Sequence, residues 1–131
     1  MKTLIVEDDF TSRVLLQEIL NQYGSVHIAV NGREAVSAAK LAQEEGEPYD
    51  LICLDIMMPE MDGQEALRLI REQEEARGIF STYGAKIIMT TALNDMRNIL
   101  AAHHSLCDAY LFKPIDKAKL LEELGKMGLL P

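Results

Sequence analysis

Five short apolar runs divide the chain, and the stretches between them carry apolar residues at every third or fourth position. The runs are Leu4–Val6, Val26–Val30, Leu51–Leu54, Ile87–Met89 and Ala109–Phe112. Several of them are continuously apolar rather than alternating with polar residues. This is typical of strands that are buried on both faces of a parallel sheet.

The stretches between the runs have the spacing of amphipathic helices. Their apolar faces consist of Leu15, Leu16, Ile19 and Leu20; Ala35, Val36, Ala39 and Ala42; Ala66, Leu67 and Ile70; Met96, Ile99 and Leu100; and Leu120, Leu121 and Leu124. Residues that commonly cap helices precede four of these faces: Asn31, Asp62, Asn94 and Asp116. Glu34 and Glu65 stand three residues after the first two caps, as in a capping box.

The pattern is therefore a strand followed by a helix, repeated five times within one domain of 131 residues. Connections of a dozen or more residues between strands predict parallel pairing. Right-handed connections then give an open sheet with helices on both faces. Residues 71–86 are less regular, and we interpret them as a long end of the third helix followed by a surface loop. The charged run from Glu72 to Arg77 is predicted to be a solvated helix end.

Composition excludes several classes of protein. Hydrophobic residues make up 48% and charged residues 26% of the chain, which is ordinary for a globular protein and argues against intrinsic disorder. No apolar run approaches the roughly 18 residues that a membrane span needs. The net charge of −8 disfavours electrostatic binding to nucleic acid or to an anionic membrane. Cys53 and Cys107 form neither a disulfide framework nor a zinc site, and a cytoplasmic location fits these features.

Acidic residues follow two of the apolar runs. Glu7, Asp8 and Asp9 come after the first run, and Asp55 comes after the third. In open α/β sheets the site lies at the carboxyl ends of the strands, so these acids converge if the two strands are neighbours. Carboxylates this close repel one another unless a cation lies among them, and an all-oxygen set favours magnesium. Acidic residues after strands also cap helices. A single acidic pair would not distinguish a helix cap from a metal site.

Two further strand ends carry polar residues. Thr90 and Thr91 end the fourth run, and Lys113 and Pro114 follow the fifth. Pro114 restricts the backbone of Lys113 to extended geometry. The Lys113 ammonium can then pair with Asp55, or with an anion attached to it, although a lysine in this place is often only a solvated charge.

These segments, in this order, resemble the receiver domain of response regulators, the phosphoacceptor of two-component signalling. The matching segments are residues 4–9, 50–63, 89–92 and 110–114, and the resemblance covers essentially the whole chain. It implies a flavodoxin-like (βα)5 fold, a doubly wound parallel sheet with strand order 2-1-3-4-5. A stand-alone, chemotaxis-regulator-like receiver is expected, because the chain ends 17 residues after Pro114, room for one helix only.

The resemblance also implies the roles of individual residues. Asp55 matches the aspartate that is phosphorylated. Glu7 and Asp8 match the acidic pair that binds Mg²⁺ (or Mn²⁺) together with Asp55, and Met57 would add its backbone carbonyl. We expect Asp9 to serve the first helix, as its N-cap or as a partner of its dipole.

Three more residues match the phosphoryl-binding and switching positions of the family. Thr91 matches the hydroxyl that bonds the phosphoryl group, and Lys113 the cation that pairs with it. Tyr110 matches the aromatic residue that changes position on activation. The implied partners are a sensor histidine kinase or phosphotransfer protein and an unknown downstream protein, with neither nucleic acid nor membrane bound directly. The domain is expected to catalyse only its own phosphorylation and dephosphorylation, and so not to be an enzyme in the usual sense.

The chain departs from the family pattern in three places. Residues 102–108 carry no glycine before the fifth strand, and the segment before the fourth strand is long and lacks the common proline. Met57 and Leu93 are apolar where polar residues often stand beside the phosphorylation site. We therefore expect slow self-dephosphorylation. His103 and His104 are adjacent and cannot bind one metal as an i, i+4 pair does, so they are interpreted as surface residues.

Three other functions share parts of this pattern. A phosphohydrolase of the haloacid-dehalogenase type needs a second aspartate two residues after the nucleophile, and Met57 stands there. An FMN carrier has the same fold, but 5% aromatic residues and no Trp leave little to stack on a flavin. A receiver that is part of a larger kinase or transcription factor stays open, because only the length of the native reading frame would decide it.

Overall fold

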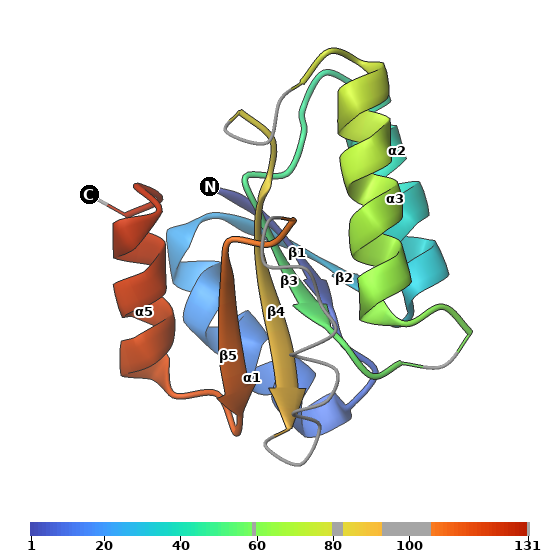
Figure 1. Cartoon of the computed structure of the whole chain (residues 1–131). Helices are drawn as coiled ribbons and strands as arrows, with labels where there is room; N and C mark the ends of the chain where they lie inside the picture. Colours follow the sequence, from blue (N-terminus) through green and yellow to red (C-terminus); the bar gives the residue numbers. More distant parts are fainter. Residues whose placement is uncertain (59, 80–82, 93–105, 131) are drawn as a thin grey trace.

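The structure is a five-stranded parallel sheet with helices on both faces (Figure 1). A computed structural model of the chain describes residues 1–58, 60–79, 83–92 and 106–130. The strands are β1 (Lys2–Val6), β2 (Ser25–Ala29), β3 (Leu51–Asp55), β4 (Lys86–Ala92) and β5 (Ala109–Lys113). Their order in the sheet is β2-β1-β3-β4-β5, which confirms the predicted topology.

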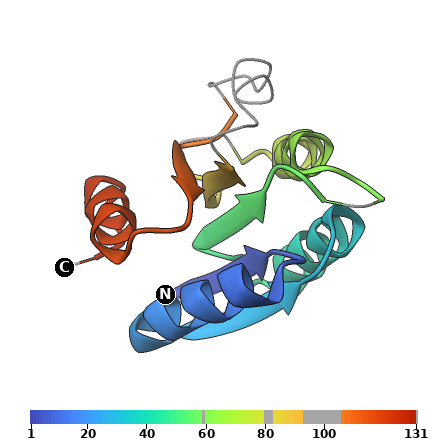
Figure 2. The ribbon, with the colours of Figure 1, turned by 90° about the horizontal axis from the view of Figure 1, so that it is seen from below.

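Four α-helices lie in the described part of the chain: α1 (Phe10–Leu20), α2 (Gly32–Glu44), α3 (Gly63–Ala76) and α5 (Lys117–Lys126). A short 3₁₀ helix, Asn21–Tyr23, follows α1. Figure 2 shows α1 and α5 on one side of the sheet and α2 and α3 on the other. Two separate apolar clusters fill these layers. The fourth predicted helix, with its cap Asn94, lies outside the described residues, as do His103, His104 and Leu93.

The helices begin where capping residues stand. The side chains of Asn31, Asp62 and Asp116 each accept a hydrogen bond from a backbone N–H in the first turn of their helix. Asp9 caps α1 in the same way, accepting from the Ser12 N–H at 2.9 Å, so its expected role is confirmed. Each such cap stabilises a helix by about 1 kcal/mol.

Strand register brings the predicted site residues to one edge of the sheet. Val6 pairs with Leu54, which sets the residues that follow them, Glu7 and Asp55, on neighbouring strands. On the other side of β3, Asp55 pairs with Thr90. In turn Ala92 of β4 pairs with Lys113 of β5. The carboxyl ends of β1, β3, β4 and β5 therefore meet.

The apolar runs predict strands that are buried on both faces. The structure confirms this for the central strands but not for β2. All five residues of β3 are buried, whereas most of β2 is exposed. Ile28 and Val30 have large exposed fractions although they belong to an apolar run. The reason is position, because β2 is an edge strand with a neighbour on one side only.

The charged end of α3 also differs from the prediction. Glu72 is exposed and pairs with Arg68 on the same helix, as a solvated helix end would. Glu74, in contrast, is 2% exposed, and its carboxylate accepts hydrogen bonds from Arg71 and from the backbone N–H of Ala85. The chain before β4 folds back onto α3 here, so the prediction of a solvated run is wrong at Glu74.

Among the described residues, no helix is long and apolar enough to cross a membrane.

Candidate functional site

Asp55 is the last residue of β3 and lies in the middle of the site edge. It is only 3% exposed, and its Oδ1 accepts a hydrogen bond from the Met57 N–H at 3.2 Å. The following loop turns closely over the strand, because the Gly63 N–H donates to the Ile56 carbonyl at 2.9 Å. A Cβ at Gly63 would lie 2.2 Å from the Asp55 carbonyl oxygen, so this approach requires glycine.

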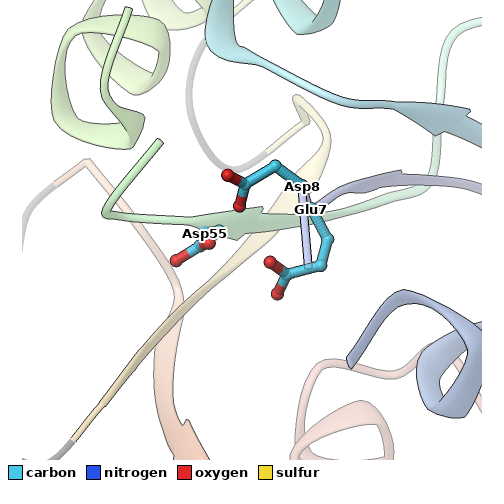
Figure 3. A group of neighbouring side chains, drawn as sticks. All are labelled: Glu7, Asp8 and Asp55. Atoms are coloured by element: carbon cyan, nitrogen blue, oxygen red, sulfur yellow. The ribbon is translucent and has the colours of Figure 1, made fainter. Parts of the chain in front are cut away.

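Three carboxylates converge beside the end of β3 (Figure 3). Glu7 is fully buried, Asp8 is exposed, and one oxygen from each of Glu7, Asp8 and Asp55 lies within 4.8 Å of the others. The other Glu7 oxygen, Oε2, accepts from the Asp9 N–H at 3.1 Å. The guanidinium of Arg13 donates to the Glu7 carbonyl at 3.2 Å. These bonds fix Glu7 in a place where its charge faces the other acids.

Lys113 extends from the end of β5 to the two buried carboxylates. Its Nζ lies 2.7 Å from Glu7 Oε1 and 3.1 Å from Asp55 Oδ2. The bond from Lys113 to Pro114 is cis. Burial alone would lower the pKa of Lys113, but the neighbouring Glu7 and Asp55 carboxylates outweigh it and raise that pKa. The ammonium therefore stays charged and partly balances the acids.

The Lys113 ammonium alone does not balance the negative charge of the three carboxylates. Burial, reinforced by the neighbouring Glu7 carboxylate, raises the pKa of Asp55 from 3.8 to about 7, although Lys113 opposes the change. The ionised form of Asp55 is therefore disfavoured in the absence of a further positive charge. This agrees with the repulsion that the sequence predicts.

The site fits a divalent cation. Its three acidic side chains offer only oxygen atoms, which are the ligands that Mg²⁺ prefers. Glu7 Oε1 is buried and accepts no hydrogen bond from the described residues, with the Lys113 ammonium as its charge partner. Two buried carboxylates that share one ammonium, one of them resisting ionisation, form an arrangement that a further bound cation would stabilise.

Thr91 and Tyr110 lie on β4 and β5, outside the acidic cluster. Thr91 is buried, and its hydroxyl donates a long hydrogen bond of 3.4 Å to the Ala92 carbonyl. Tyr110 is half-buried. It pairs with Met89, which lies two residues before Thr91 on β4. The half-exposed Met57 follows Asp55 closely, and the role of its carbonyl stays a prediction.

Sequence reasoning missed two residues beside the site. Phe10, at the start of α1, is 69% exposed, and the Arg13 guanidinium lies 5.5 Å from the centroid of its ring. The signal was present, since residues three apart on a helix share a face. Together they place an exposed aromatic ring and a cation beside the end of β1.

Comparison with known proteins identifies the family. The family model of the response regulator receiver domain matches residues 3–125. This chain belongs to the response regulator receiver family. The predicted resemblance and the flavodoxin-like fold are thereby confirmed, and the phosphohydrolase and FMN-carrier alternatives are set aside. Receiver domains belong to two-component phosphorelay signalling, which is the functional class of this chain.

A receiver of the same family occurs in much longer proteins. The chain is 36% identical over 128 residues to hybrid signal transduction histidine kinase L of Dictyostelium discoideum, covering 97% of this chain and 7% of that protein. Across the similar curated kinases and regulators, this chain spans between 4% and 17% of their length. The activities of those much longer proteins are therefore not assigned to this chain.

Two solved receiver structures are close in fold. The receiver domain of sensor histidine kinase PA1611 from Pseudomonas aeruginosa holds a magnesium ion in its active-site cleft; it has a TM-score of 0.75 and 30% identity, over 97% of both chains. The receiver domain of the Saccharomyces cerevisiae regulator Ssk1 was solved with the histidine phosphotransfer protein Ypd1. Its TM-score is 0.77 and its identity 33%, over 99% of this chain and 92% of that one.

Proposed function

We propose that Asp55 accepts a phosphoryl group from a histidine kinase or a phosphotransfer protein, and that this switches a protein-binding surface. The observation that carries the proposal is the position of Asp55: a buried carboxylate at a strand end, beside two more acids and a lysine. The similar Ssk1 receiver, solved with a phosphotransfer protein, supports this class of donor.

Glu7, Asp8 and Asp55 would hold a divalent cation, with the Met57 carbonyl as a further ligand. Magnesium in the PA1611 receiver supports Mg²⁺, and Mn²⁺ offers the same chemistry to oxygen ligands. The cation, when bound, neutralises the charge that builds up as carboxylates and phosphoryl oxygens approach one another.

The chain's own residues supply the rest of the chemistry. A carboxylate oxygen of Asp55 forms a bond to phosphorus as the bond between phosphorus and the donor's imidazole nitrogen breaks. Lys113, already 3.1 Å from Asp55, then pairs with the new phosphoryl oxygens. The Thr91 hydroxyl leaves its long bond to the Ala92 carbonyl and donates to the phosphoryl group instead. Positioning and charge balance of this kind account for most of phosphoryl-transfer catalysis.

The wider setting follows from the same proposal. Residues 1–131 form a single receiver domain that catalyses only its own phosphorylation and dephosphorylation. It acts in the cytoplasm on a protein target, without binding nucleic acid or membrane directly. The mass of the native protein in its cell distinguishes a separate receiver from a receiver inside a longer kinase.

The test is phosphorylation with a small donor. Wild-type protein incubated with Mg²⁺ and acetyl phosphate should gain the mass of one phosphoryl group, measured on the intact protein. Asp55→Asn should gain none. Asp50→Asn, one residue before the start of the same strand, is the matched control and should be phosphorylated normally. An adduct that persists in Asp55→Asn would contradict the proposal.

A further inference from the structure

The first residue of α2 lies against the loop that joins β3 to α3. A Cβ at Gly32 would lie 2.3 Å from the Met61 carbonyl oxygen and 3.0 Å from Met61 Cγ. Real Cβ atoms essentially never come closer than 3.0 Å to another heavy atom of this kind. The loop, residues 57–62, therefore passes the start of α2 at a distance that only glycine permits (Figure 2).

Space, and not backbone conformation, is the reason for this glycine. The φ angle of Gly32 lies outside the left-handed region that favours glycine. Gly32 begins a regular helix, whose N-cap Asn31 accepts a hydrogen bond from the Glu34 N–H at 2.8 Å. Within a helix, alanine is about 1 kcal/mol more favourable than glycine. The close approach of Met61 is therefore what requires glycine here.

Both ends of the same loop are fixed. The Ile56 N–H donates to the Thr90 carbonyl at 3.0 Å, and the Gly63 N–H donates to the Ile56 carbonyl at 2.9 Å. Ile56 is also buried in the apolar cluster that α2 and α3 form with the sheet. A displacement of Met61 cannot be taken up at Ile56 or Gly63, so it moves the residues that lie between them.

Met57 is one of those residues, and it lies directly beside the site. Its N–H donates to Asp55 Oδ1 at 3.2 Å, so its position is linked to that of the carboxylate. In the proposed function, the Met57 carbonyl is a further ligand of the cation. Mg²⁺ requires near-octahedral ligands at about 2.0–2.1 Å. A small movement of this carbonyl should therefore weaken binding of the metal.

We propose that Gly32 is a positioning residue for the Mg²⁺ site. Because it has no side chain, α2 packs directly on the Met61 backbone, and this contact places the loop that carries the Met57 carbonyl. The inference rests on the proposed function and deepens it. Gly32 touches neither the metal nor the phosphoryl group, and it acts only through the loop.

The size of the effect follows from the distances. Ordinary contact of a Cβ begins at 3.4 Å, so Gly32→Ala must move Met61 and α2 apart by roughly 1 Å. Residues that orient the ligands of a metal typically change its affinity by about 10- to 100-fold when they are mutated. We expect a loss of Mg²⁺ affinity in this range.

The experiment is a titration of the intact ¹⁵N-labelled chain with Mg²⁺ alone, followed by NMR. The Met57 amide signal reports on the loop before metal is added, and the signals that move during the titration give the dissociation constant. Circular dichroism measures the folded fraction of each variant under the same conditions.

Two variants serve as matched controls. Ala39→Gly weakens the same helix about two turns beyond Gly32, so it lowers stability without adding a group beside Met61. Gly125→Ala makes the same chemical change as Gly32→Ala in α5, where a Cβ would meet nothing within 4 Å.

In Gly32→Ala we expect the metal-free Met57 amide signal to shift and the dissociation constant for Mg²⁺ to rise about 10- to 100-fold. Ala39→Gly should be less stable than wild type but should bind Mg²⁺ with wild-type affinity. Gly125→Ala should match wild type in both the Met57 signal and the affinity.

The inference is overturned if wild type binds Mg²⁺ and Gly32→Ala binds it equally well. It is also overturned if Ala39→Gly loses as much affinity, because general weakening of α2 would then explain the result. Failure of Gly32→Ala to fold where Ala39→Gly folds overturns it too, since the contact would then hold the domain together instead of placing the loop.

A wild-type protein that binds no Mg²⁺ contradicts the proposed metal site instead. In that case the metal-free Met57 signal still decides whether Gly32 places the loop, and an unchanged signal in Gly32→Ala rejects this role.

Discussion

The crowding of carboxylates around Asp55 predicts an unusual effect of mutation: removing its charge should stabilise the metal-free protein. Most substitutions of buried residues are destabilising. Asp55→Asn keeps the size and shape of the side chain, and Lys113 retains Glu7 as its partner at 2.7 Å. The substitution therefore removes a disfavoured charge without leaving the lysine unpaired.

The sign and size of the effect follow from the pKa of Asp55, which folding raises from 3.8 to about 7. The stability linked to this group is fully present below about pH 4, where Asp55 is protonated in both states. It is lost as the pH rises toward 7, because only the unfolded chain then ionises freely. This pKa difference corresponds to about 4 kcal/mol. Solvent at the sheet edge screens charges. We therefore expect Asp55→Asn to raise the free energy of unfolding of the metal-free protein by about 2 kcal/mol at neutral pH.

The assay is urea unfolding of wild type and Asp55→Asn in chelator, at a series of pH values from 4 to 8. The advantage of the variant in free energy of unfolding should grow across this range and level off above pH 7. Asp8→Asn is the control within the cluster and should gain less, because Asp8 is exposed. An advantage that is absent, or that shrinks as the pH rises, would refute the reasoning.

Three further predictions concern the metal, the switch and the phosphoryl lifetime. Millimolar Mg²⁺ should raise the melting temperature, since a ligand of the native state stabilises it, and Asp8→Asn should nearly abolish the gain; an unchanged melting temperature counts against the site. Beryllofluoride with Mg²⁺ should shift NMR signals between Thr91 and Lys119, and shifts that avoid this segment altogether would contradict the switch. Met57→Asn and Leu93→Glu should speed loss of phosphate about tenfold by hydrogen-bonding the attacking water; a decay time course no faster than wild type would show that these positions do not set the lifetime.

Much of the site could be predicted because strand ends are visible in the sequence. Glu7 and Asp55 follow apolar runs directly, and the parallel sheet brings such positions to one edge. The caps Asp62 and Asp116 could be predicted for a similar reason, since their side chains bond to N–H groups only a few residues away. These features depend on local sequence and on a topology that the family resemblance implies.

The features that could not be predicted depend on contacts between distant segments. Glu74 continues the buried face of α3, four residues after Ile70, yet its charge suggested an exposed position. Only the fold shows that Arg71 and the Ala85 N–H satisfy its carboxylate. In the same way, an apolar run does not reveal that β2 is an edge strand. The pairing of Lys113 with both Glu7 and Asp55 likewise follows from the geometry of three separate strands.

The central claim is that Asp55 itself carries the phosphoryl group. Borohydride reduces an aspartyl phosphate to homoserine, so it marks the phosphorylated residue permanently. Wild-type protein, treated with acetyl phosphate and Mg²⁺ and then reduced, should show homoserine at position 55 on peptide mass spectrometry, and omission of Mg²⁺ should remove it. Homoserine at Asp8 or Asp9 in place of position 55, or at no position in the chain, would contradict the account.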